Sequence, residues 1–98
     1  MKKRTVEVNG VVYEVTNDAN GVFDEALFLE KYTDYFTGFD YIVGDISYNK
    51  LRLKGFYDSD NPKVKLINDI KNLDDYIQNF CAFGCKHYVL KKVKTSKN

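Results

Sequence analysis

Both cysteines and the single histidine of this chain lie in one short segment, at Cys81, Cys85 and His87. Thiolate and imidazole groups are the ligands that zinc prefers, but a structural zinc site takes more protein ligands than these three and usually has closely spaced cysteine pairs. Redox pairs share that close spacing. The segment therefore indicates two small buried thiols, with a thiol or metal site at Cys81, Cys85 and His87 as a remote alternative.

Acid–base catalysis finds little support among the titratable residues. Asp40 and Asp45 are an odd number of positions apart, so a regular strand directs them to opposite faces and they cannot act as a pair. Turn and capping roles are the preferred interpretation of both residues. No serine or cysteine nucleophile can be placed beside His87 from the pattern. We therefore expect a protein that is not an enzyme and that uses no cofactor.

Polar side chains cluster in the stretch 40–56, where two strand-like runs meet at a turn. Residues 51–54 alternate leucine with a cation, so the leucines are expected to face the core and the cations the solvent. Arg52 suits recognition of a carboxylate or another anion, because its guanidinium donates in a fixed fork. An alternative is that Arg52 and Lys54 pair with the acidic first helix. The candidate binding residues are Asp45, Tyr48, Asn49, Arg52, Lys54 and Phe56.

RNA binding is the second hypothesis for the same region. Without the first strand, the expected elements follow the β-α-β-β-α-β order of RNA-recognition domains. In such a fold Tyr13 and Phe56 would be exposed on central strands and would stack on bases. Arg52, Lys54 and the C-terminal lysines would then contact phosphates. The basic-glycine-aromatic motif stops early, however, since Asp58 stands where an aromatic residue should recur.

Charge is unevenly distributed along the 98 residues, although the net charge is +1. Residues 5–49 carry nine acidic side chains and one lysine, whereas residues 86–98 carry five lysines and no acid. Such segregation gives a dipolar surface if the segments stay apart, and mutual neutralisation if the acidic helix and basic strands lie side by side. Both outcomes remain open from the sequence.

The N-terminus and the hydropathy pattern indicate a cytoplasmic protein. Residues 1–4 lead into an alternating run, and no apolar signal sequence is readable there. No stretch approaches the apolar length of a membrane helix, so we expect no membrane association. Two cysteines in a chain without an export signal are typical of reduced thiols in the cytosol.

Local patterns in the first half predict a hairpin followed by a helix. Asn9 and Gly10 supply the positive φ angles of a tight turn between β-branched runs at 5–8 and 11–15. Asp24 is a typical helix N-cap, and an aromatic stripe predicts one amphipathic helix from there to Gly38. The stripe consists of Phe28, Tyr32, Tyr35, Phe36 and Phe39.

The second half predicts shorter elements. Residues 41–43 read as a buried strand, Gly44 and Asp45 as a bulge or strand end, and 47–49 as a turn into the alternating strand. Val64 and Leu66 suggest a further short strand. Asn72 is expected to cap a second helix that Gly84 ends, and 87–93 is expected to form the final strand.

These elements predict one α+β domain spanning residues 1–93, with order ββαββ(β)αβ. We expect an antiparallel sheet of five or six strands with two helices packed on one of its faces. Residues 94–98 would form a frayed basic tail.

The stretch 40–56, the segment 80–85 (Phe-Cys-Ala-Phe-Gly-Cys) and the following 88–91 (Tyr-Val-Leu-Lys) resemble the YutD-like family of small uncharacterised bacterial proteins. The similarity runs from the first hairpin to Val93. Ile46 and Ser47 depart from the family pattern, in which a Trp-Gly pair is expected. The resemblance implies a compact cytosolic α+β protein and brings no established activity with it.

The sequence as a whole predicts a non-catalytic binding or interaction module that uses the surface from Asp45 to Lys54. Its partner would be an unidentified protein or RNA. The sequence indicates neither the identity of that partner nor the oligomeric state.

Overall fold

The computed structural model describes residues 4–8, 10–18, 21–47, 50–80 and 86–93 of the chain. The strands are β1 (Thr5–Val8), β2 (Val11–Asn17), β3 (Tyr41–Ser47), β4 (Lys50–Phe56) and β5 (Lys86–Lys92). The α-helices are α1 (Glu25–Lys31) and α2 (Leu73–Phe80), and short 3₁₀ helices are η1 (Asp34–Gly38), η2 (Leu66–Asn68) and η3 (Ile70–Asn72).

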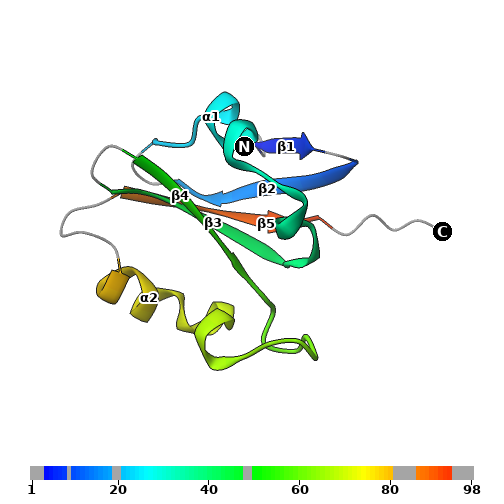
Figure 1. Ribbon diagram of the computed structural model, residues 1–98, viewed down its shortest axis with the longest axis vertical. Helices are drawn as coiled ribbons and strands as arrows, with labels where there is room; N and C mark the ends of the chain where they lie inside the picture. The colour runs from blue at the N-terminus through cyan, green and yellow to red at the C-terminus, as the bar shows by residue number, and fades with distance from the viewer. Residues whose placement is uncertain (1–3, 9, 19–20, 48–49, 81–85, 94–98) are drawn as a thin grey trace.

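The five strands form one sheet in the order β1-β2-β5-β3-β4, with every neighbouring pair antiparallel. The prediction of an antiparallel α+β sheet with two helices is confirmed. The last strand inserts between β2 and β3, so β4 lies at one edge of the sheet and β1 at the other (Figure 1). β4 therefore has a strand neighbour on one side.

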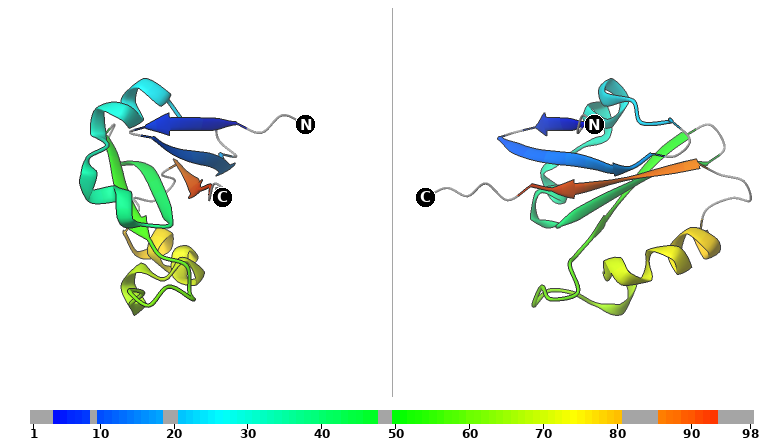
Figure 2. Two further views of the ribbon diagram at one scale, coloured as in Figure 1. Left: turned by 90° about the vertical axis from the view of Figure 1, so that its right-hand side faces the viewer. Right: turned by 180° about the vertical axis from the view of Figure 1, so that it is seen from behind.

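The two α-helices lie on opposite faces of the sheet (Figures 1 and 2), so the prediction that both pack on one face is wrong. Ile42 and Leu90 belong to the apolar cluster beneath α1, whereas Val43 and Val89 belong to the cluster beneath α2. Consecutive residues along β3, and along β5, are thus buried on opposite faces of the sheet. These strands read as near-continuous apolar runs, which is typical of a sheet covered on both faces.

The local signals at the first hairpin and the first helix are confirmed. Gly10 has φ +80°, as the tight turn requires, and Val8 pairs with Val11 across it. The Asp24 carboxylate accepts a 3.2 Å hydrogen bond from the Leu27 amide and caps α1.

The single long helix expected up to Gly38 is wrong, because α1 ends at Lys31 and η1 follows after a break. Tyr32 and Thr33 are both extended at this break. The Tyr32 hydroxyl hydrogen-bonds the Tyr13 hydroxyl at 3.1 Å and the Thr37 hydroxyl at 3.0 Å. Tertiary contacts of one buried ring therefore override the helical periodicity of the stripe.

Three further expectations concern the second half. β3 runs through Gly44 and Asp45 with unbroken pairing to both neighbours, so the predicted bulge or strand end is wrong. The short strand at Val64 and Leu66 is also wrong, because Leu66 begins η2 and is 78% exposed. The turn at 48–49, the helix end at Gly84 and the tail 94–98 lie outside the described residues.

Gly44 allows the Tyr88 ring to lie close to the backbone of β3 in the apolar cluster beneath α1. Tyr88 lies opposite Gly44 on β5, and a Cβ atom at position 44 would overlap the Tyr88 ring. Both residues are buried. Any side chain at this position therefore requires the Tyr88 ring to move.

We expect Gly44→Ala to lower the free energy of unfolding by about 1–3 kcal/mol, because the ring of Tyr88 must move to accommodate the methyl group. Urea denaturation followed by circular dichroism measures the loss. Gly38→Ala is the matched control, since a Cβ there meets no atom within 4 Å, and we expect its effect to stay within about 0.5 kcal/mol. Equal losses in the two variants would contradict the packing argument.

Candidate functional site

A buried carboxylate lies at the centre of the α2-facing side of the sheet. Asp45, in the middle of β3, has 0% of its surface exposed. It accepts a 2.8 Å hydrogen bond from Nε of Arg52 on β4 and a 3.2 Å hydrogen bond from the Tyr76 hydroxyl on α2. Both partners satisfy a charge that would otherwise be costly to bury. The carboxylate therefore joins an inner strand, the edge strand and the helix.

The environment keeps the Tyr76 hydroxyl protonated and able to donate. Burial, and next the nearby Asp45 carboxylate, raise the pKa of Tyr76 from 10 to about 12, while the Arg52 cation opposes the shift. The raised pKa extends the pH range in which the protonated hydroxyl donates to Asp45 into the alkaline region.

Two cations on β4 lie on this same side of the sheet. The Arg52 side chain is 47% exposed although its Nε contacts Asp45. The Lys54 ammonium lies 5.3 Å from the ring centroid of Phe56 and 5.7 Å from that of Tyr76, within cation–π range. The alternative in which Arg52 and Lys54 pair with the acidic first helix is wrong, because α1 covers the opposite face.

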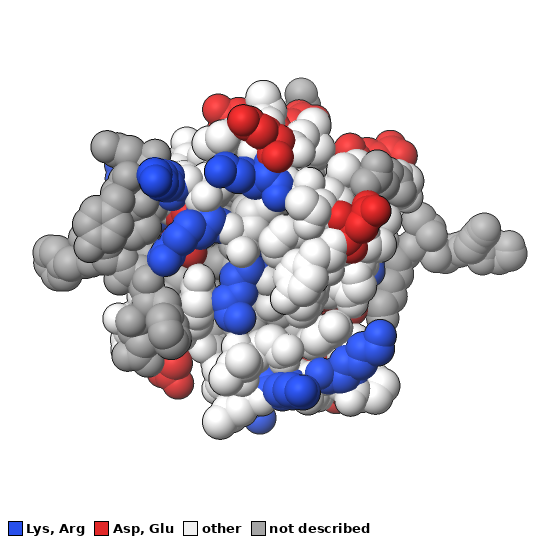
Figure 3. Space-filling view, in the orientation of Figure 1, with Lys and Arg blue, Asp and Glu red and all other residues white. Residues whose placement is uncertain are grey.

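A groove of about 390 Å³ follows the outer edge of β4. Residues 52–55 form its floor, Tyr35 and Phe39 line it from the α1 side, and Ile67 and Tyr76 line it from the α2 side. Basic side chains gather along the course of β4 on this side of the molecule (Figure 3). The groove thus combines a strand edge, aromatic walls and positive charge.

Apolar side chains at the rim of this groove are strongly exposed. Tyr35 is 70% exposed and Ile67 73% exposed. Large apolar groups gathered beside charged ones are typical of surfaces that contact another macromolecule. These two residues provide the apolar part of the candidate site.

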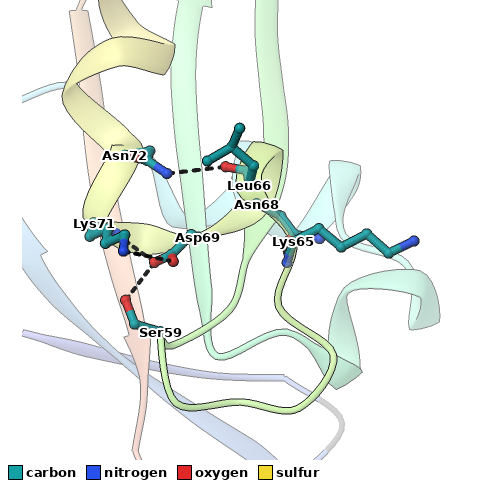
Figure 4. A network of polar contacts seen from close by, with 7 residues as sticks. All are labelled: Ser59, Lys65, Leu66, Asn68, Asp69, Lys71 and Asn72. Carbon is teal, nitrogen blue, oxygen red and sulfur yellow. Dashed lines mark hydrogen bonds and ion pairs between the residues drawn. The ribbon is translucent and has the colours of Figure 1, made fainter.

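A network around Asp69 holds the segment that carries Ile67 (Figure 4). The Ser59 hydroxyl donates a 2.5 Å hydrogen bond to the Asp69 carboxylate, and the Lys71 amide donates another at 3.1 Å. The hydrogen bond from Ser59 is the main cause of a lowered pKa at Asp69, which burial opposes. The wall of the groove is therefore anchored by a charged group.

Of the predicted binding residues, the structure brings Asp45, Arg52 and Lys54 together. Tyr48 and Asn49 lie outside the described residues. Phe56 is 0% exposed beneath α2, so the expectation that it offers a free ring is wrong.

The geometry expected for RNA stacking is also wrong. Tyr13 is buried in the α1 cluster rather than exposed beside Phe56. β2 and β4, which carry these two rings, are separated by β5 and β3. Base stacking needs exposed rings on an open face, and helices cover both faces at these positions.

The thiol and metal alternative rests mainly on residues whose structure is not described. Cys81 and Cys85 lie outside the described ranges, while His87 is half-buried on β5 opposite Asp45. Within the described part of the chain, no group of three or more metal-ligating side chains is placed to hold an ion.

Sequence reasoning missed Tyr35, Ile67 and Tyr76 as members of the site. Tyr35 belongs to the aromatic stripe that predicts core positions, Tyr76 lies within the expected second helix, and Ile67 directly follows the expected short strand. No sequence signal separates Tyr35 from the buried rings, because it shares their helical spacing.

Comparisons with known proteins agree on one family. The family model described as "Putative antitoxin YutD-like" matches residues 7–91. "Putative antitoxin YutD" from Bacillus subtilis (strain 168) is 39% identical over 87 residues, which cover 89% of this chain and 96% of that protein. The solution NMR structure of protein yutD from B. subtilis is similar with a TM-score of 0.78 and 36% identity, covering 97% of this chain and 86% of that one.

Among the described residues, no helix has the length and apolar character needed to cross a membrane.

We expect Arg52→Gln to lower the free energy of unfolding by about 2 kcal/mol, because it leaves the Asp45 charge buried with a weaker donor. In an Asp45→Asn background the same substitution should cost about 0.5 kcal/mol, since a neutral amide does not require a cation. Urea denaturation of the four proteins measures the coupling. Lys54→Gln, on the same strand and side, is the control and should cost about 1 kcal/mol or less. Additive losses would show that the pair does not act as a unit.

The raised pKa of Tyr76 predicts how alkaline pH affects stability. The folded protein keeps this proton up to about pH 12, whereas the unfolded chain releases it near pH 10. Its contribution is therefore complete below pH 10 and is lost as the pH rises towards 12. The stability advantage of the wild type over Tyr76→Phe should shrink between about pH 9 and about pH 11 in urea denaturation. Other tyrosines titrate in both proteins and cancel, so a constant difference would contradict the assignment.

Proposed function

This chain belongs to the YutD-like family, and we propose that it is a non-catalytic module that binds a protein partner through the groove beside β4. The observation that carries the proposal is the combination of exposed Tyr35 and Ile67 with the cations Arg52 and Lys54 around one groove. Interfaces between proteins are enriched in aromatic residues and arginine at their centres. Asp45 would act by holding Arg52 in place rather than by contacting the partner.

The relative from B. subtilis supplies the class of partner. Its description as a putative antitoxin implies a toxin as the protein it acts upon. We extend this to the present chain, whose partner would be a cytoplasmic toxin with an acidic and partly apolar surface. Binding would block that toxin by covering it, so the chain needs no catalytic group of its own.

The charge of the groove supports an acidic partner. Arg52 and Lys54 lie on its floor, and both project towards the side where α2 lies. An acidic surface on the partner would raise the association rate constant, and added salt would lower it. The apolar rim at Tyr35 and Ile67 would supply contacts that persist at moderate salt. RNA, by contrast, would be held mainly by charge and released as salt rises.

A photo-crosslinking residue at position 67 should capture a protein partner in the cells that encode this chain. Ile67 lies at the rim of the groove, whereas Leu29 on α1 is a matched exposed apolar control outside it. We expect a discrete crosslinked protein from position 67 that survives nuclease treatment, and none from position 29. Gel analysis and mass spectrometry provide the measurement.

The captured protein is then expressed alone and with this chain. Growth should slow when the partner is expressed alone and recover when the wild-type chain is present, while Ile67→Asp should fail to restore it. Crosslinks to RNA, or equal capture from both positions, would overturn the proposal. A captured protein without effect on growth would overturn only the toxin part of it.

A further inference from the structure

We propose that the partner contributes an extended segment with alternating acidic and apolar side chains, which joins the sheet as a new strand beside β4. This inference rests on the proposed function, because it specifies how the same groove binds its partner. Strand addition gives affinity through main-chain hydrogen bonds and specificity through side chains at alternate positions.

The direction of the backbone groups follows from Tyr57, the residue directly after β4. Its amide donates to the Asn68 carbonyl at 2.7 Å, and its carbonyl accepts from the Ile70 amide at 3.0 Å. Both groups therefore point away from β3. Because successive residues of a strand direct these groups to opposite sides, Gly55 and Leu53 point theirs the same way as Tyr57.

This edge already accepts a strand-like segment at one point. Tyr57 and Asp69 form an isolated parallel bridge, which the Asp69 network stabilises (Figure 4). Because the bridge is parallel, the residues that precede Asp69 lie towards Gly55, and there they form η2 rather than a strand. Leu53 lies beyond Gly55 along the same edge, so an added strand would pair with β4 there.

Among the described residues, Leu53 offers the partly accessible edge backbone beside the bridge, whereas Gly55 is buried with the Phe39 ring against it. Within the described part of the chain, no backbone hydrogen bond from another segment reaches the outer side of Leu53 or Gly55. Both residues form part of the groove floor. An unpaired donor and acceptor at the floor of a groove are the groups that an extended peptide would satisfy.

The walls of the groove determine which side chains the added strand carries. On the α2 side Arg52 contacts Asp45 and Lys54 lies over the Tyr76 ring, so this side of β4 is positively charged and residues beside it should be acidic. On the α1 side Leu53 and the rings of Tyr35 and Phe39 form the wall, so residues there should be apolar. Successive residues of a strand face opposite sides, which gives the alternating pattern.

A second copy of this chain is a poorer occupant of the edge. Pairing β4 with another β4 would bring Lys50, Arg52 and Lys54 of one molecule beside the same cations of the other. Like charges on neighbouring strands destabilise a sheet. These cations thus disfavour self-association while they favour an acidic strand.

The probe is a capped peptide of alternating glutamate and valine, added to isotope-labelled full-length protein. We expect NMR shift changes centred on the amide of Leu53. N-methylation of the peptide amides that face the protein should weaken binding by about tenfold or more, whereas N-methylation of the alternate amides should leave it nearly unchanged. This pair of peptides leaves the protein unaltered, so no folding defect can mimic the result.

Side-chain pattern is tested with a lysine–valine peptide and two protein variants. The lysine–valine peptide should not bind, and Lys54→Gln should weaken the glutamate–valine peptide by about threefold or more. Lys91→Gln is the matched control, since Lys91 is an exposed strand lysine that lines a different cavity.

Equal loss from both N-methylated peptides, or shifts outside the edge of β4, would overturn strand addition. A protein crosslink at Ile67 obtained together with that outcome would leave the proposed function intact and reject this mode of binding alone. Loss of both the crosslink and the peptide shifts would reject the groove as a binding site.

Discussion

The arrangement of this molecule depends on the burial of one carboxylate. Asp45 lies between two sheet neighbours and beneath a helix, where an ionised group is costly unless it is paired. Arg52 and Tyr76 provide the pairing from β4 and α2. These contacts hold α2 and the cationic side of β4 on the same face of the sheet. The position of the candidate groove follows from both.

Elements encoded by neighbouring residues could be predicted from the sequence. The Asn-Gly hairpin and the Asp24 cap depend on one or two side chains and their own backbone, and both are as expected. Features set by distant contacts could not be predicted. The break after Lys31 lets Tyr32 reach Tyr13, and helix periodicity contains no information about that partner.

The candidate site divides in the same way. Alternation correctly predicted that Arg52 and Lys54 point away from Leu51, which is buried in the α1 cluster. Alternation alone could not show that α2 covers the second face, and for that reason Phe56 was expected to be exposed when it is buried. The sequence could not predict that the segment around Ile67 lies beside β4, because that proximity depends on the pairing at Tyr57.

The sheet also separates two cores of unequal size. Of the described residues, nine buried side chains form the cluster beneath α1 and three form the cluster beneath α2. Free energy from apolar burial scales with area, so the smaller core resists local opening less. We therefore expect α2 to open before the larger core does. Such an opening would hydrate Asp45 and release Arg52 from it. The position of the Arg52 cation on β4 is thus coupled to the stability of α2.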